Sequence, residues 1–195
     1  MNRIVLASRN NHKILEIKTI LQDLPYEFLT LNDFPDVPAL REDGATFQDN
    51  SLQKAEAVHR LTKLPALADD SGLEVFYLNG RPGVISARYA GAEASDEKNN
   101  EKLLGEMRGV APRRRRAQFR AVLTLLDDKG REVTEGICPG KLGESPRGTN
   151  GFGYDPIFIP DRFSRTYAEL TAEEKNKISH RARALAGMRE ILQRR

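Results

Sequence analysis

Apolar and polar residues follow one another along the chain with two alternating periods, one typical of strands and one typical of helices. An apolar run at 4–7 precedes a polar turn, after which apolar residues recur three and four apart up to Pro25. A second helical pattern covers 47–61 and ends before a proline. An apolar run resumes at 66–68, and the alternation at 73–77 indicates a further strand. This order of strands and helices predicts an α/β fold.

The second half of the chain continues the same alternation. Ser95, followed by two acidic residues, is typical of a capped helix start. The odd positions of 117–125 are apolar and a turn at 128–130 follows, so 117–137 predicts a hairpin. Six glycines and two prolines between 136 and 153 predict a loop that can approach a ligand closely.

A C-terminal helix is predicted from its start signal and from its apolar stripe. Thr171 and Glu174 form a capping box. The stripe consists of Ile178, Ala182, Leu185, Met188 and Leu192. No internal repeat or low-complexity linker interrupts the chain, so its 195 residues predict a single domain over 1–195, with or without two lobes.

The composition of 39% hydrophobic and 30% charged residues is that of a soluble globular protein. No apolar run approaches the roughly 20 residues needed to cross a bilayer, and the apolar start is too short for the core of a signal peptide. Cys138 is the only cysteine, which excludes an intrachain disulfide and a cysteine-based zinc site. We therefore expect a cytoplasmic protein that does not enter a membrane.

A net charge of +3 suits a polyanionic ligand without saying which one. The densest basic segment is 113–116, four consecutive arginines that belong either to a solvated loop or to a nucleic-acid surface. No zinc-finger, RNA-recognition or homeodomain signature accompanies this run, so we expect no nucleic-acid partner.

The polar turn at 8–13 is the first candidate for chemistry. It lies between the first strand and the first helix, and a helix N-terminus offers free N–H groups to a phosphate. Ser8 and Asn10 can donate to phosphate oxygens, and Lys13 supplies charge. The alternative is an ordinary turn in which Asn10 caps the helix; the spacing is not that of a P-loop.

A second candidate is the acidic pair Asp69 and Asp70, with Glu42 upstream. Adjacent carboxylates repel unless a cation or a shared proton relieves them, and Mg²⁺ prefers carboxylate oxygens together with substrate phosphates. Glu42 with Asp69 or Asp70 is therefore a candidate partial ligand set. The alternative is a simple turn made by Gly72.

The third candidate joins 151–156 to Lys175 and to 179–181. Phe152 can stack on a base, and His180 and Arg181 can donate to the keto oxygen and ring nitrogen of a purine. Three consecutive residues fan over about 200° on a regular helix. We therefore expect 179–181 at a helix start, with Lys175 on a separate short turn. The alternatives are core packing for Phe152 and a helix-start histidine for His180.

Together these motifs resemble the inosine triphosphate pyrophosphatase family, the non-standard purine triphosphate or dITP/XTP pyrophosphatases. The resemblance runs almost end to end, and the order and spacing of its pieces make it specific. The matching residues are Leu6-Ala7-Ser8, Asn10, Lys13, Glu42, Gly44, Phe47, Asn50, Lys54, 68–73, Pro82-Gly83, 86–89, 151–156 and Ser179-His180-Arg181.

The resemblance implies an elongated mixed sheet with flanking helices, two lobes with the active site in the cleft between them, and a homodimer. It implies hydrolysis of ITP, dITP and XTP to the monophosphate and pyrophosphate with Mg²⁺. Glu42 and Asp70 would hold the metal, Asp70 would also activate water, and Lys54 would contact phosphate. The other implied substrate residues are Ser8, Arg9, Asn10, Asn11, His12, Lys13, Ser71, Phe152, Gly153, Tyr154, Asp155, Lys175, His180 and Arg181.

Two features of the sequence bear on the reaction and on the nearest rival. No Ser-His or Cys-His pair indicates a covalent nucleophile, so direct attack by water is expected. The rival is a Maf-like pyrophosphatase that acts on other nucleoside triphosphates and shares the early Leu-Ala-Ser strand. Ser179-His180-Arg181 argues against that rival.

Overall fold

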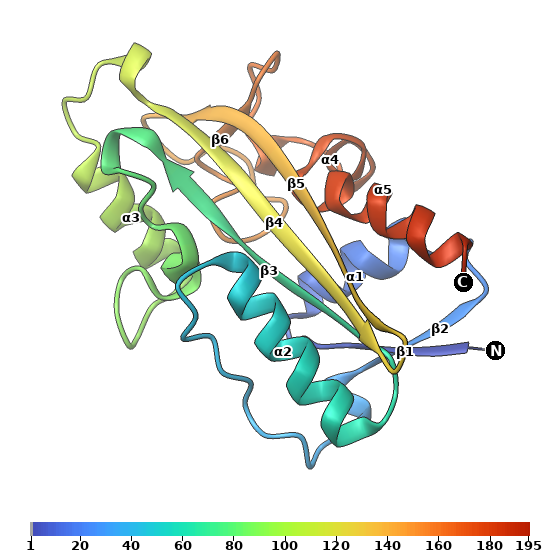
Figure 1. Cartoon of the computed structure of the whole chain (residues 1–195). Helices are drawn as coiled ribbons and strands as arrows, with labels where there is room; N and C mark the ends of the chain where they lie inside the picture. Colours follow the sequence, from blue (N-terminus) through green and yellow to red (C-terminus); the bar gives the residue numbers. More distant parts are fainter. Residues whose placement is uncertain (1) are drawn as a thin grey trace. The chain divides into compact units, whose positions relative to one another are not determined.

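The structure of the chain is a computed structural model that describes residues 2–195 (Figure 1). Within these residues the strands form one sheet in the order β2-β1-β3-β4-β5-β6. β1 is parallel to β2 and β3, whereas β5 and β6 are antiparallel, which confirms a mixed sheet and the predicted α/β class. The strands are β1 (Asn2–Leu6), β2 (Tyr26–Thr30), β3 (Ala66–Val75), β4 (Arg116–Asp127), β5 (Gly130–Leu142) and β6 (Phe158–Pro160). The helices are α1 (Asn11–Ile20), α2 (Phe47–Thr62), α3 (Asp96–Glu106), α4 (Ala172–Ile178) and α5 (His180–Gln193).

The chain divides into two compact units. The first unit comprises the residues up to Asp70 together with 121–136 and 181–195. The second unit comprises 71–120 and 137–180. Each boundary falls inside or beside a regular element, so β3, β4 and β5 contribute residues to both units.

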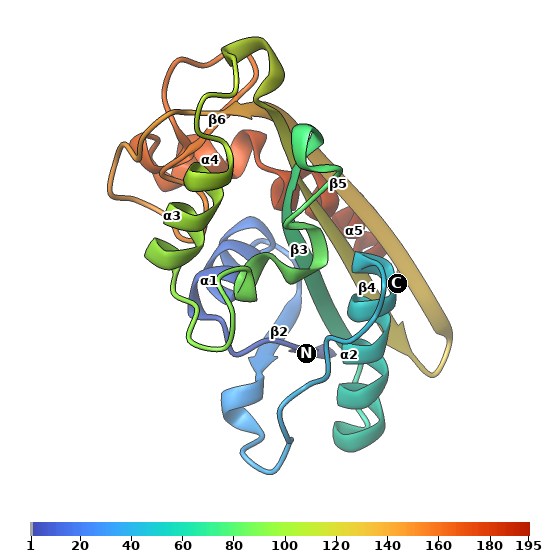
Figure 2. The same ribbon diagram turned by 90° about the vertical axis from the view of Figure 1, so that its left-hand side faces the viewer.

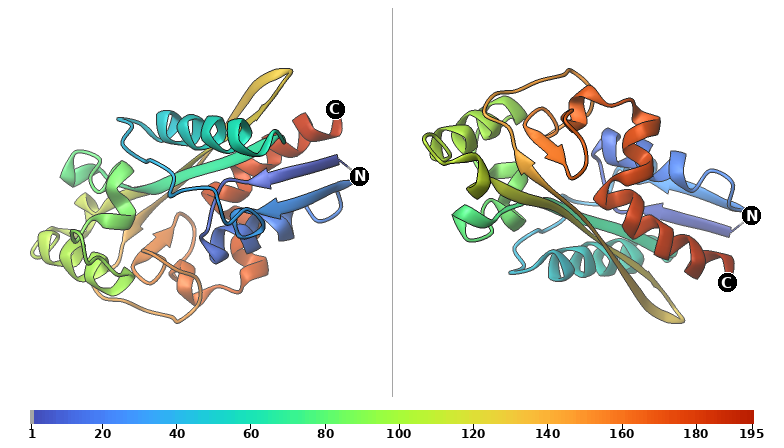
Figure 3. Two further views of the ribbon diagram at one scale, coloured as in Figure 1. Left: turned by 90° about the horizontal axis from the view of Figure 1, so that it is seen from below. Right: turned by 90° about the horizontal axis from the view of Figure 1, so that it is seen from above.

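The first unit has helices on both faces of its strands. Because side chains alternate along a strand, Ile4 and Leu6 of β1 face one way and Val5 and Ala7 the other. The first face packs against α1 and α5, and the second against α2 and residues near Leu31. The parallel pair β1 and β2 can be followed in both views of Figure 3. This unit is a three-layer arrangement of helix, sheet and helix.

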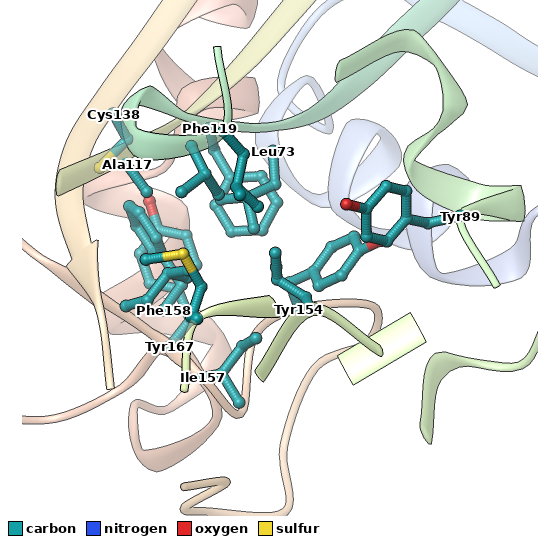
Figure 4. Close-up of a cluster of buried hydrophobic side chains, with 14 of the residues drawn as sticks. Leu73, Tyr89, Ala117, Phe119, Cys138, Tyr154, Ile157, Phe158 and Tyr167 are labelled. Atoms are coloured by element: carbon teal, nitrogen blue, oxygen red, sulfur yellow. The ribbon is translucent and has the colours of Figure 1, made fainter. Parts of the chain in front are cut away.

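The second unit has its own core, built around aromatic rings (Figure 4). Phe119 of β4 meets Phe158 of β6 edge to face, with ring centroids 4.8 Å apart. Tyr167 stacks on the same Phe119 ring at 5.7 Å, and Leu73 of β3 belongs to the same cluster. Such pairs add to the free energy gained from burying the rings.

The predicted hairpin is confirmed as β4 and β5, joined by Asp128 and Lys129 (Figure 2). The predicted loop from 136 begins later than expected, because β5 continues to Leu142. Pairing with β6 keeps this glycine-containing stretch extended, with Gly140 opposite Pro160 and Leu142 opposite Phe158. Tertiary pairing here overrides a weak local strand preference.

The helix predictions differ in how well their ends were placed. α2 and the α3 start at Ser95 are confirmed, whereas α1 ends at Ile20 rather than at the expected Leu24. The capping box at Thr171 is confirmed, but the C-terminal helical region is two helices. The break is at Ser179, whose ψ of 159° is extended, so the prediction of a helix start there is confirmed.

The arginine run is used largely within the second unit. Arg115 is buried, and its guanidinium donates to the carbonyls of Met107, Leu142 and Gly143. Arg116 pairs with Asp161, and Arg114 lies over the Tyr77 ring. These contacts favour the loop interpretation over a nucleic-acid surface. None of the helices within residues 2–195 combines the length and apolar character that a bilayer span requires.

Candidate active site

The acidic pair lies inside β3, so the interpretation of this motif as a turn made by Gly72 is wrong. Successive side chains of a strand point to opposite faces. Asp69 therefore shares the face of Leu67 with α1 and α5, and Asp70 shares the face of Ala68 with α2. The repulsion between the two carboxylates is relieved by separate cations on the two faces rather than by one shared cation.

Asp70, Lys54, Glu42 and Asn50 form the Asp70 cluster, on the α2 face of the first unit. Nζ of Lys54 donates to Oδ1 of Asp70 at 2.9 Å and to Oε1 of Glu42 at 2.7 Å. Nδ2 of Asn50 donates to Oδ2 of Asp70 at 3.1 Å. The contacts bring together the predicted base, both predicted metal ligands and the lysine predicted to touch phosphate.

Burial controls the proton affinity of this cluster. It raises the pKa of Asp70, and the opposing charges of Lys54 and Lys13 offset only part of that rise. Burial works against the charge of Lys54, but Asp70 and Glu42 outweigh it and raise the pKa of the ammonium. A carboxylate with a raised pKa is a better proton acceptor for water than an ordinary surface aspartate. The general-base role of Asp70 stays a prediction.

The carboxylates of the Asp70 cluster fit a magnesium ion. Within residues 2–195 no group of three or more His, Cys, Asp or Glu side chains is placed to hold a metal. A pair is available, since Oε1 of Glu42 and Oδ1 of Asp70 contact the same nitrogen. Mg²⁺ is usually bound by one or two carboxylates together with waters and substrate phosphates. Glu42 and Asp70 match that need.

Asn50 belongs to the Asp70 cluster, although the sequence analysis assigned it no role. Its side chain is fully buried, and Oδ1 accepts from the backbone N–H of Gly44 at 2.8 Å while Nδ2 holds Asp70. One amide thus ties the segment that carries Glu42 to the carboxylate of Asp70. A usable signal was its spacing, since Asn50 precedes Lys54 by one helical turn and faces the same strand.

The close approach at Gly44 gives a stability prediction. A Cβ at this position would lie 2.7 Å from Cβ of Asp49 and 2.8 Å from Oδ1 of Asn50. Gly44→Ala should therefore lower the free energy of unfolding by about 1–3 kcal/mol through overpacking, as measured by urea denaturation. Gly105→Ala is the matched control, because its added Cβ meets nothing within 4 Å and alanine favours the α3 helix. Equal stability of the two variants would contradict the steric role of Gly44.

Asp69, Lys13, Arg181 and Glu16 form the Asp69 cluster on the other face of β3. Lys13 donates to Oδ1 of Asp69 at 2.5 Å, and Nε of Arg181 donates to Oδ2 at 2.9 Å. Nη1 of Arg181 donates to Glu16. Burial opposes ionisation of Asp69, but Arg181 and Lys13 outweigh it and hold the pKa of this carboxyl well below its usual range. Asp69 is therefore an internal anion that orients two cations.

The predicted phosphate segment forms the N-terminal turn of α1. Oδ1 of Asn10 accepts from the N–H of Lys13, so Asn10 is the helix cap, and Oγ of Ser8 accepts from the N–H of Asn10. Arg9 donates to the carbonyls of Leu31 and Val37. Asn11 and His12 are exposed in the first turn. The capping alternative is thus confirmed for Asn10, and phosphate binding by the segment stays a prediction.

The predicted base-binding residues lie mainly in the second unit. Oδ2 of Asp155 accepts from the N–H of Phe152 at 3.0 Å and from Nζ of Lys175 at 2.5 Å. The same Nζ lies 4.8 Å from the centroid of the Phe152 ring. Gly151 has a φ of +76°, and a Cβ there would lie 2.0 Å from Oδ2 of Asp155. These contacts hold Phe152 in a defined place as a half-buried aromatic platform.

Two residues of α3 form hydrogen bonds to the backbone of this loop. The N–H of Gly153 donates to Oδ2 of Asp96 at 2.6 Å, and the carbonyl of Gly153 accepts from Nδ2 of Asn100 at 2.8 Å. The sequence predicted only a helix start at Asp96, because nothing local connects α3 to residue 153. Loop residues held in this way are preorganised for binding.

The remaining predicted residues are placed as follows. The His180 ring stacks on Phe119 with centroids 4.6 Å apart, and Tyr154 is buried with its hydroxyl donating to the carbonyl of Ser86. Ser71 follows Asp70 in β3 and is half-buried. Contact of these residues with a base or a phosphate stays a prediction.

Known proteins are similar to this chain in sequence and in fold over nearly their whole lengths. The profile of the Ham1 family matches residues 4–191. The chain belongs to the Ham1 family. It is 51% identical over 193 residues to the dITP/XTP pyrophosphatase of Geobacter sulfurreducens, covering 98% of this chain and 97% of that relative. It is 46% identical to the dITP/XTP pyrophosphatase of Clostridium perfringens, covering 98% of each chain.

Solved Ham1 structures agree with the fold. A HAM1 protein from Coxiella burnetii is similar with a TM-score of 0.92 and 42% identity, over the full length of both chains. The Staphylococcus aureus Ham1 protein is similar with a TM-score of 0.88 and 41% identity, covering 98% of each chain. The resemblance to the pyrophosphatase family that the motifs indicated is thereby confirmed.

Proposed function

We propose that this chain is a nucleoside triphosphate pyrophosphatase that hydrolyses non-standard purine nucleotides, ITP, dITP and XTP, to the nucleoside monophosphate and pyrophosphate. The observation that carries the proposal is the Asp70 cluster. It combines a buried carboxylate of raised pKa with a second carboxylate and a lysine. On the other face of the same strand, Asp69 pairs with Lys13 of α1. The names of the Geobacter and Clostridium relatives give the substrate class, and they favour it over the Maf-like alternative.

In this proposal, different residues of the first unit bind the phosphates, activate water and hold the metal. The N-terminal turn of α1 and Lys13 bind the triphosphate through backbone N–H groups and charge. Asp70 orients a water molecule toward the α-phosphorus and accepts its proton at a carboxylate oxygen. Asn50 and Lys54 fix the plane of that carboxylate. Glu42 and Asp70 hold Mg²⁺, which when bound neutralises charge on the phosphates and on the pyrophosphate that leaves.

In this proposal the base is recognised by the loop at 152–155 together with His180 and Arg181. Phe152 stacks on the purine, and the backbone of 152–155 approaches the ring edge. His180 and Arg181 donate to the keto oxygen and the neighbouring ring nitrogen. Adenine presents an amino donor where these substrates present a keto oxygen, so ATP is a poor substrate. We also propose a homodimer working in the cytoplasm, as the family resemblance and the single cysteine favour.

One experiment tests both the reaction and the metal requirement. ITP, XTP, dITP, GTP, ATP and a pyrimidine triphosphate are each incubated with the protein and Mg²⁺, and pyrophosphate and orthophosphate are measured separately. We expect pyrophosphate from ITP, XTP and dITP, loss of activity with EDTA, and recovery with Mg²⁺. Orthophosphate with a diphosphate product would overturn the proposal. A preference for pyrimidines would restore the Maf-like alternative, and full activity in EDTA would remove Glu42 and Asp70 as metal ligands.

A further inference from the structure

Lys54 contacts the same carboxylates that fit the metal. Its ammonium group has three N–H donors, and three acceptors receive them: Oε1 of Glu42, Oδ1 of Asp70 and the carbonyl of Asp69. The side chain is buried, with an exposed fraction of 4%. In this arrangement all three donors are directed at the protein itself.

A lysine so placed has to change partners before it can touch a phosphate. Desolvated ammonium groups are costly unless each donor is satisfied. A polyphosphate offers new oxygen acceptors, so Nζ can leave the carboxylates only when such acceptors arrive. The two carboxylates left behind would then repel each other unless a second cation takes the place of the ammonium.

We propose that Lys54 is an internal counter-ion that competes with the divalent metal for Glu42 and Asp70, and that it transfers to the phosphate chain when metal and nucleotide bind together. This inference rests on the proposed function, since it assumes that Glu42 and Asp70 are the metal ligands. Metal alone then binds weakly, because it must displace a buried ammonium from two of its three acceptors. Metal and polyphosphate bind cooperatively, because each provides what the other displaces, and such coupling is reciprocal.

The competition predicts that loss of Lys54 tightens metal binding. A lysine that only supports the site would leave metal binding unchanged or weaken it when lost. Lys54→Met removes the competing charge and keeps a similar apolar stem, so the affinity for a divalent cation in the absence of nucleotide should rise. The expected increase is about tenfold or more, from the loss of one like charge within a few Å at intermediate effective dielectric. The same substitution should reduce turnover, since the phosphate loses its lysine.

The test is titration of the protein with Mn²⁺, which shares the preference of Mg²⁺ for oxygen ligands. Electron paramagnetic resonance measures the concentration of the free ion at each step. Lys13→Met is the matched control, because it removes a lysine from the other face of β3, where the partner is Asp69. Tighter Mn²⁺ binding in Lys54→Met than in Lys13→Met supports the proposal. Unchanged or weaker binding in Lys54→Met, or an equal gain in Lys13→Met, overturns it.

Two further measurements separate failure of the competition from instability of the variant and from failure of the metal assignment. If Lys54→Met is unstable, Mn²⁺ should raise its melting temperature more than it raises that of the wild type, because the metal replaces the missing cation between Glu42 and Asp70. Lys54→Gln is a second variant that removes the charge. If Mn²⁺ does not rescue Lys54→Met and does not bind Lys54→Gln more tightly than the wild type, the proposal is overturned. Glu42→Gln in an otherwise wild-type chain tests the metal site itself. If it leaves Mn²⁺ binding unchanged, the metal assignment fails; if it weakens binding while Lys54→Met does not tighten it, only the competition fails.

Discussion

Asp70→Asn should reduce the turnover number for ITP by on the order of 10²–10⁴-fold, the usual contribution of a general base. An amide of the same shape cannot accept the proton from water, and it offers less charge to Mg²⁺. The fold should persist, because Asn50 and the α2 packing around residue 70 remain. Initial rates at saturating ITP and Mg²⁺, with a circular dichroism spectrum of the same preparation, measure both effects.

The hydrogen bonds of Asp70 allow a control that separates loss of the base from loss of local structure. In the wild type both of its oxygens accept a hydrogen bond, from Asn50 and from Lys54. An asparagine side chain must point its NH₂ group at one of these donors, which shifts the local contacts without exposing the core. Asn50→Ala should then give a smaller loss than Asp70→Asn, because it frees one carboxylate oxygen but keeps the base. Near wild-type turnover of Asp70→Asn would remove Asp70 from the mechanism.

The acidic motif shows why the sequence pointed to candidate residues but misjudged their surroundings. Asp-Asp-Ser-Gly is rich in turn-forming residues, so local statistics favour a turn. In the structure it is part of a ten-residue strand, because β1 pairs with the start of β3 and the cations that satisfy the carboxylates come from elsewhere. Lys13 and Arg181 approach Asp69 from α1 and α5, 56 and 112 positions away in sequence. No window of local sequence contains that information.

The C-terminal helices show the opposite case. The capping box at Thr171 is a local signal, and it specified the start of α4. The break at Ser179 followed from geometry, since three consecutive residues of one continuous helix cannot face a single ligand. Helical periodicity placed the end of α1 too late, at Leu24 rather than at Ile20. Where a prediction rested on local hydrogen bonding, as at Thr171, it held. Where strands were extended by pairing, as in β5, it did not.

Arg181→Ala should lower the free energy of unfolding by about 3–5 kcal/mol, the cost of removing one partner from a buried ion pair. The guanidinium is 1% exposed, and it joins the carboxylates of Asp69 and Glu16. Its loss leaves Asp69 paired with Lys13 and leaves Glu16 partly buried without its arginine partner. Native stabilities are only about 5–15 kcal/mol, so this is a large fraction of the total. Urea denaturation measures the difference.

Arg189→Ala is the matched control, since Arg189 lies on the same helix and pairs with the exposed Asp23. Exposed pairs contribute about 0–1 kcal/mol, so this variant should be much less affected. A similar loss in both variants would show that the buried network around Asp69 has no special weight.

Arg181 can serve as a reader of the base or only as a partner of Asp69 and Glu16. Arg181→Lys distinguishes these two roles, because it retains the charge but not the planar, two-pronged donor. If Arg181 also reads the base, activity on ITP and XTP should fall more than activity on ATP. The initial preference for keto purines should be large, since a donor left facing the amino group of adenine is unpaired, and such mismatches give discrimination of roughly 10⁴-fold. Turnover of ITP, XTP, GTP and ATP by wild type and Arg181→Lys measures the ratios. Equal losses on ITP and ATP would mean that Arg181 acts only through Asp69 and Glu16, orienting Lys13 and the start of α5, and that His180 and the backbone of 152–155 select the base without it.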